Sequence, residues 1–138
     1  MNRRDFQNLS RLRLREARLL LKNRYYEGAY YLAGYSVEYA IKACIAKNVN
    51  QYDFPNKQLA IDSYSHKIEQ LIKVAGLTPQ LTAQINANRI FEVNWSLVTD
   101  WSEKERYTPI VTKQRAKDLY SAITSRRNGV MTWLRRLW

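Results

Sequence analysis

The chain contains little cysteine, histidine, proline or glycine: its 138 residues include one Cys, one His, three Pro and four Gly. The single cysteine, Cys44, excludes an internal disulfide, and we interpret it as a buried structural thiol. One histidine and one buried cysteine without clustered carboxylates do not make a coordination sphere, so we expect no metal. A Gly-rich phosphate loop and a nucleophile elbow are also missing, and we expect no cofactor.

Long apolar runs are missing as well. No segment approaches the roughly 18 consecutive apolar residues of a membrane-spanning helix. The first residues, MNRRDFQNLSRLR, are basic but are not followed by a continuous apolar core, which argues against a secretory signal. We therefore expect a cytoplasmic protein that does not enter a membrane.

Acidic residues are scarce relative to basic ones, and the formal net charge is +11. Residues 1–24 carry eight Lys/Arg against two acids, and residues 113–138 carry seven against one, so the positive charge belongs to the two ends of the chain. Charge at this density repels itself in the folded state and favours a polyanionic partner. The alternative is a soluble protein whose basic faces are simply solvated.

Helical periodicity without any alternating strand pattern predicts an all-α fold in a single domain, residues 1–138. The expected helices are residues 5–22, 25–47, about 63–74, 79–88 with a continuation toward 101 and a break near Asn88, and 112–127. A connection is expected at residues 48–62, and a short closing turn at residues 130–138. Ser63 or Ser65 is expected to cap the third helix, and Gly76 to end it.

Residues 25–47 are small or apolar on almost every side, which is typical of a central helix surrounded by others. Glu38 and Lys42, one turn apart, lie on its single polar face. If Glu38 is buried it needs partners, and Arg13, which points with the leucines of the first helix, is the expected one. The pair has either a structural role or a place in the lining of a pocket.

The first helix carries a narrow basic stripe opposite its apolar face. Its members fall within about 60° of one another on the helical wheel: Arg4, Arg11, Arg15, Arg18 and Lys22. Together with Arg126, Arg127, Arg135 and Arg136 near the end of the chain, they are candidates for phosphate contacts.

A second candidate site is a cleft in which a base stacks on aromatic rings while Arg106 holds a phosphate, with Tyr107 beside it. The tryptophans of this cleft are Trp95 and Trp101. Helical spacing also places them in one stripe with Phe91 and Val98, which is typical of core packing. His66 is interpreted as a capping or packing residue rather than a catalytic base.

Residues 29–43 (AYYLAGYSVEYAIKA) resemble the second helix of the HEPN family, the higher-eukaryote and prokaryote nucleotide-binding domains. The remaining similarities follow in the order expected of one subgroup: Ser65-His66-Lys67-Ile68 with Leu71, Asn94-Trp95, Trp101 with Arg106-Tyr107, and Gly129-Val130 with Trp133. The resemblance covers essentially the whole chain. It implies an up-and-down bundle of about five helices, a homodimer, and a setting beside a minimal nucleotidyltransferase in toxin–antitoxin or defence systems.

Many proteins of this family are metal-independent endoribonucleases with an Arg, four to six spacer residues and a His. That motif is absent here, because no arginine precedes His66 at the required spacing. The nearest match is Arg89 followed by Asn94. An asparagine cannot shuttle a proton near pH 7, and the general acid–base catalysis that is thereby lost contributes roughly 10²–10⁴-fold to the rate. The sequence therefore favours no catalytic residue in this chain.

The hypothesis from the sequence is a non-catalytic HEPN-type module that binds nucleic acid or a nucleotide, as the accessory half of a system with a nucleotidyltransferase. The expected binding residues are Arg11, Arg15, Arg18, Lys22, Arg106, Tyr107, Arg126 and Arg127. The alternatives are a divergent metal-independent endoribonuclease using Arg89, Arg106 or His66, and a pure dimerisation module.

Overall fold

The computed structural model describes residues 1–49, 57–102 and 110–138, and within these ranges all regular structure is helical. The all-α expectation is confirmed. Eight helices are described where about five were expected: α1 Arg3–Lys22, α2 Tyr26–Lys47, α3 Lys57–Asp62, α4 Ile68–Val74, α5 Thr78–Ala87, α6 Arg89–Thr99, α7 Lys113–Thr124 and α8 Val130–Arg135.

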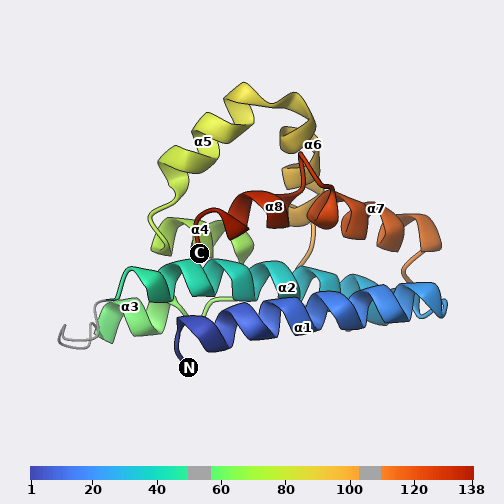
Figure 1. Ribbon diagram of the computed structural model, residues 1–138, viewed down its shortest axis with the longest axis horizontal. Coiled ribbons are helices and arrows are strands. Elements are labelled where there is room, and N and C mark those ends of the chain that lie inside the picture. The colour runs from blue at the N-terminus through green and yellow to red at the C-terminus, as the bar shows by residue number, and fades with distance from the viewer. Residues whose placement is uncertain (50–56, 103–109) are drawn as a thin grey trace.

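The two longest helices, α1 and α2, lie side by side in opposite directions, as Figure 1 shows. Helices α4, α7 and α8 cover the other side of α2, and α5 and α6 lie farthest from α1 (Figure 1). Helix α2 is thus enclosed, with twelve buried residues along its 22. This confirms that the apolar segment is the central helix, because only contacts on several sides bury residues around a whole helix.

Helix α1 begins two residues earlier than expected because Asn2 caps it. The Asn2 side chain accepts a hydrogen bond from the Asp5 backbone N–H, and the Asp5 carboxylate accepts one from the Asn2 backbone N–H, both at 2.9 Å. This capping box satisfies two backbone donors of the first turn. After Lys22, Arg24 has a φ of 67°, and the chain reverses into α2.

The structure corrects the expectation for residues 57–62, which form α3 where a connection was expected. Half-buried Leu59 of α3 packs against the core cluster, and such tertiary contact decides whether a short segment becomes helical. Residues 50–56 lie outside the described ranges. Neither Ser63 nor Ser65 is the N-cap of α4, a position that Lys67 takes; the Ser65 hydroxyl accepts from the Lys67 backbone N–H instead.

Helix α4 ends as expected at Gly76, whose φ is +70°. The N–H of Leu77 bonds to the carbonyl of Ile72, and the N–H of Gly76 to that of Lys73, which is the Schellman pattern. A non-glycine residue is strained at this φ.

The expected break near Asn88 is present and separates α5 from α6. The Asn88 side chain accepts from the Phe91 backbone N–H at 3.0 Å and so caps α6. Its amide group also donates to the Asn128 side chain at 2.8 Å. The α5–α6 junction is therefore tied to the turn between α7 and α8.

Helix α7 ends at Thr124, three residues before the expected end, and the chain turns tightly before α8. The Ser125 carbonyl accepts from the Gly129 backbone N–H and from the Thr132 hydroxyl, both at 2.9 Å. A Cβ atom at Gly129 would lie 2.3 Å from that carbonyl oxygen, so the turn requires glycine.

Candidate nucleic-acid interface

The basic stripe of α1 is exposed to solvent. Arg11, Arg15, Arg18 and Lys22 are all exposed, while Ser10 and Ala17 on the inner face are fully buried. Among the described residues, no carboxylate lies within 4.0 Å of these four cations. The helix therefore presents a row of charges that the protein itself does not neutralise.

Basic residues from the two ends of the chain meet at Trp138. The guanidinium carbon of Arg11 lies 4.9 Å from a ring centroid of the Trp138 side chain, and that of Arg135 lies 5.7 Å away. The Arg3 guanidinium donates to the backbone carbonyl of Trp138 at 2.6 Å. Two guanidinium groups are thus held at the indole by cation–π contact, and a third is held at the backbone of the same residue.

The proximity of Arg11 affects the pKa of Arg135. Partial burial, and then the charge of Arg11, lower the pKa of Arg135 below its usual range. Neither Arg11 nor Arg135 has an Asp or Glu side chain as a partner within the described ranges. Because no acidic side chain compensates this charge, the cluster is suited to an anion.

The remaining predicted binding residues lie elsewhere. Arg126 and Arg127 are exposed in the turn between α7 and α8, which lies on the other side of α2 from α1 (Figure 1). Their turn adjoins the α5–α6 junction through the Asn128 contacts. Arg106 and Tyr107 lie outside the described residues, and so does the part of the proposed cleft that they form.

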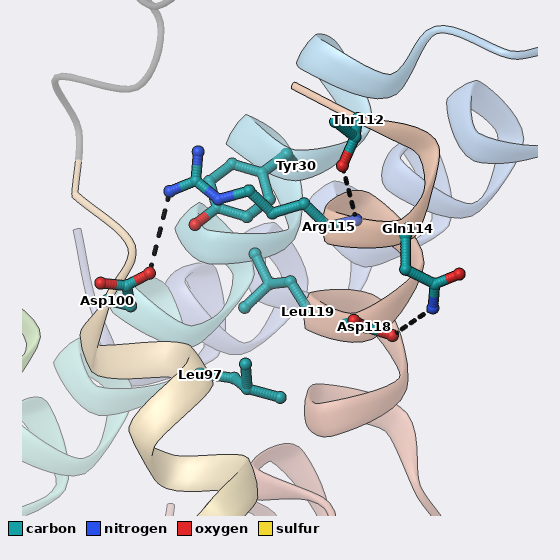
Figure 2. Close-up of a pocket in the computed structure, with 8 residues that line it drawn as sticks. All are labelled: Tyr30, Leu97, Asp100, Thr112, Gln114, Arg115, Asp118 and Leu119. Atoms are coloured by element: carbon teal, nitrogen blue, oxygen red, sulfur yellow. Dashed lines mark hydrogen bonds and ion pairs between the residues drawn. The ribbon is translucent and has the colours of Figure 1, made fainter. Parts of the chain in front are cut away.

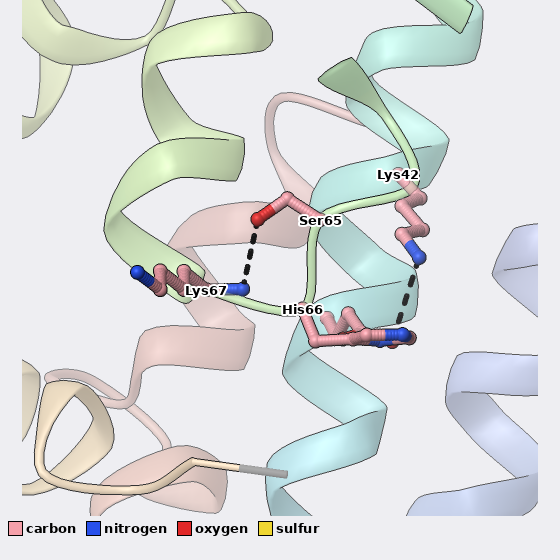
Figure 3. A network of polar contacts seen from close by, with 5 residues as sticks. Lys42, Ser65, His66 and Lys67 are labelled. Carbon is pink, nitrogen blue, oxygen red and sulfur yellow. Dashed lines mark hydrogen bonds and ion pairs between the residues drawn. The ribbon is translucent and has the colours of Figure 1, made fainter. Parts of the chain in front are cut away.

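Glu38 is almost fully buried, and its partner is His66 rather than Arg13. Oε1 of Glu38 lies 2.8 Å from Nδ1 of His66, and Oε2 lies 3.5 Å from Nζ of Lys42. Figure 3 shows Lys42 and His66 converging from α2 and from the segment before α4. Arg13 instead pairs with Glu16 of its own helix, so the expected Arg13–Glu38 contact is wrong.

The environment of Glu38 perturbs its titration. Burial raises the pKa of the Glu38 carboxyl, and the nearby Lys42 ammonium and His66 ring oppose that shift only in part. The His66 side chain remains 42% exposed. Since the carboxylate holds the Nδ1 edge, it fixes the orientation of the imidazole ring.

The tryptophan stripe of α6 is core. Phe91, Trp95, Val98 and Trp101 are all buried, as the helical spacing predicted. Trp95 and Phe91 pack edge-on against Trp133 of α8. These rings are therefore not a stacking surface for a ligand in this structure.

Arg89 and Asn94 are the nearest match to the ribonuclease motif, but the structure places them in different surroundings. Arg89 is exposed at the start of α6, whereas the Asn94 amide donates to the backbone carbonyl of Asn128 at 2.9 Å. Asn94 thereby holds the α7–α8 turn.

A cleft of about 280 Å³ lies between the end of α6 and the start of α7. Its lining includes Leu97, Leu119 and Tyr30 (Figure 2). Arg115 extends across the Tyr30 ring, with its guanidinium carbon 4.6 Å from the ring centroid. One guanidinium nitrogen of Arg115 lies 3.8 Å from a carboxylate oxygen of Asp100. The cleft is partly apolar and partly polar.

Other site classes find no support within the described ranges. No group of three or more His, Cys, Asp or Glu side chains there is arranged to hold a metal ion. None of the described helices is both long enough and apolar enough to cross a membrane.

Two features escaped the sequence reasoning. Trp138 and Arg3 were not singled out, although an aromatic residue within a basic terminus is a recognisable signal. The Glu38–His66 contact joins residues 28 positions apart, and no local pattern reveals it.

Comparison with known proteins gives one match. The family model of the HEPN domain matches residues 8–136, which is nearly the whole chain. No curated protein and no solved structure matches significantly. With its helical fold and a family match of this extent, the chain belongs to the HEPN family.

Proposed function

We propose that this protein binds nucleic acid, or a nucleotide, through the surface that α1 and α8 form together, and that it does not cleave its ligand. We call this surface the α1–α8 basic surface; it consists of Arg3, Arg4, Arg11, Arg15, Arg18 and Lys22 of α1 with Arg135 of α8 and Trp138. The proposal fits a family whose domains often bind nucleic acid.

The observation that carries the proposal is the approach of Arg11 and Arg135 to one indole without an Asp or Glu side chain paired to either. Like charges held this close lower the stability of the protein unless an anion joins them. Phosphate groups match guanidinium in charge and in geometry. The basic stripe of α1 extends the positive charge over several helical turns. A ligand with several phosphates in a row therefore fits this surface better than a single phosphate does.

The test is a titration of a fluorescently labelled single-stranded oligonucleotide at several salt concentrations. The logarithm of the affinity should fall linearly with the logarithm of the salt concentration, with a slope of about −0.7 for each phosphate neutralised. The variant Arg11→Glu/Arg135→Glu should bind weakly and show a shallower slope. Equal affinity at all salt concentrations, or no binding by the wild type, would refute the proposal.

One observation favours the alternative of a divergent endoribonuclease. The buried Glu38 orients the His66 imidazole, which is how a carboxylate prepares a histidine for general acid–base catalysis. Incubation of RNA with wild-type protein and with His66→Ala separates the two functions. Cleavage by the wild type that the variant lacks would replace the non-catalytic proposal.

We place this module in a two-component system, as the accessory half beside a nucleotidyltransferase of the toxin–antitoxin or defence type. The support is the family membership together with a positively charged surface able to hold a ligand for a partner enzyme. Copurification with the product of a neighbouring nucleotidyltransferase gene tests this placement, and the absence of any complex would count against it.

A further inference from the structure

The cleft between α6 and α7 combines an apolar base with an acidic rim. Its volume of about 280 Å³ is just below the range of roughly 300–1,000 Å³ that is usual for ligand pockets, so it suits a small molecule. Leu119 and Tyr30, which line its base, are each 2% exposed, and Leu97 is 38% exposed. The other side chains of the lining are polar or charged, and two of them are acidic.

The two acidic side chains, Asp100 and Asp118, flank the cleft from different helices. Asp100 is the C-cap of α6, and Asp118 lies on α7. Figure 2 shows the side chains of Leu97 and Leu119 between the two carboxyl groups. The lining therefore presents a carboxylate, an apolar stretch and a second carboxylate in that order.

The charge of this lining is opposite to that of the whole protein. The chain carries 23 basic and 12 acidic residues, whereas the lining carries one basic residue, Arg115, against the two aspartates. Within the described ranges, no Lys or Arg nitrogen lies within 4.0 Å of the Asp118 carboxylate. Two carboxylates at one small cleft repel an anion and attract a cation.

The side chain of Arg115 shows how the cleft receives a cation. Its guanidinium carbon lies 4.6 Å from the centroid of the Tyr30 ring, and one nitrogen lies 3.8 Å from an oxygen of Asp100. An aromatic face and a carboxylate are groups that stabilise an organic cation. Asp100 is 74% exposed, and Asp118 accepts a hydrogen bond from Gln114 at 2.7 Å. Each carboxylate therefore keeps lone pairs for a further donor.

We propose that this cleft binds an aliphatic diamine or polyamine. One ammonium group pairs with Asp100 and a second pairs with Asp118, while the methylene stem packs on the two leucines between them. Ammonium groups donate charge-assisted hydrogen bonds to carboxylates, and methylene groups leave water on contact with leucine. The site is separate from the α1–α8 basic surface, because none of its lining residues belongs to α1 or α8. The inference does not depend on the proposed function.

Calorimetric titration with putrescine, cadaverine and spermidine, at constant ionic strength, tests the proposal. We expect saturable binding of one molecule per chain. Butylamine has the same stem as putrescine but only one ammonium group, and it should bind about fivefold more weakly. Absence of saturable binding for all three amines, or equal affinity for butylamine and putrescine, would overturn the proposal.

The variants Asp100→Asn and Asp118→Asn test the two ends of the site separately. Each should raise the dissociation constant of putrescine about fivefold, and so remove its advantage over butylamine. Asparagine at position 118 keeps a carbonyl oxygen for the Gln114 bond, and circular dichroism should show unchanged helix content. The control is Glu92→Gln, which removes the same charge from an exposed position of α6 outside the cleft. An equal loss in this control would reveal attraction to net charge alone and overturn the proposal.

Backbone amide chemical shifts locate the bound amine. Titration of isotope-labelled protein with putrescine should change the shifts most at the end of α6 and along α7. Helix α1, whose acidic residues are Asp5 and Glu16, should change little. The largest changes in α1, or changes spread evenly over the chain, would contradict the assignment of the cleft.

Discussion

The indole of Trp101 occupies the space that a Cβ atom on Gly34 would need. Such an atom would lie 2.0–2.2 Å from Cε2, Cδ2 and Nε1 of the ring. Trp101 is 3% exposed and also packs edge-on against Tyr35. The glycine in the centre of α2 therefore sets how closely the end of α6 approaches the central helix.

The first prediction concerns this contact. Gly34→Ala should lower the free energy of unfolding by about 3 kcal/mol, because the rigid indole cannot move aside without disturbing the core. Gly28→Ala in the same helix is the control, since its Cβ would meet only Cδ1 of Leu20, at 3.2 Å. It should be neutral or stabilise by up to about 1 kcal/mol through helix propensity. Urea denaturation measures both, and equal effects would contradict the prediction.

The second prediction concerns the raised pKa of Glu38. A carboxyl whose pKa is higher in the folded state favours folding fully only below its unfolded value of about 4.5, and loses that contribution as the pH rises through the folded value. The stability of wild type minus that of Glu38→Gln should therefore fall as the pH rises above about 4.5. Each unit of elevation corresponds to about 1.4 kcal/mol.

Chemical denaturation of both proteins between acidic and neutral pH measures this difference. Glu69→Gln on neighbouring α4, where the carboxyl is exposed, serves as the control. A difference that is flat, or that rises with pH, would show that pairing with Lys42 and His66 outweighs the burial of Glu38.

The third prediction separates local recognition from net charge. Arg11→Glu/Arg15→Glu and Arg126→Glu/Arg127→Glu change the charge of the protein equally, but only the first pair lies on the α1–α8 basic surface. We expect the first variant to lose most of its oligonucleotide affinity and the second to lose much less. Equal losses in the binding titration would indicate a diffuse effect of net charge.

The fourth prediction concerns the thiol. Cys44 is 2% exposed, and burial raises its pKa to about 11. The thiolate is the reactive form, so the native protein should react slowly with a thiol-specific reagent at pH 8 and rapidly once unfolded in urea. Fast reaction of the folded protein would show that α2 is not enclosed as described.

Local patterns in the sequence were sufficient for much of the fold. The even apolar character of residues 25–47 predicted an enclosed helix, and Gly76 and Asn88 mark the end of α4 and the break before α6 as expected. These features depend on neighbouring residues alone, since periodicity, caps and left-handed turns involve only a few positions along the chain. The α3 helix was missed because its stability depends on packing rather than on its own sequence.

The sequence by itself determined which side chains share a face, and hence the basic row of α1 and the apolar stripe of α6. It also determined that Glu38 would need a partner if buried. Only the tertiary structure decided that this partner is His66, and that Arg11 and Arg135, 124 positions apart, approach the same indole. The physical reason is that helical periodicity fixes the direction of a side chain on its own helix, whereas the neighbour that it meets is chosen by the packing of the whole chain.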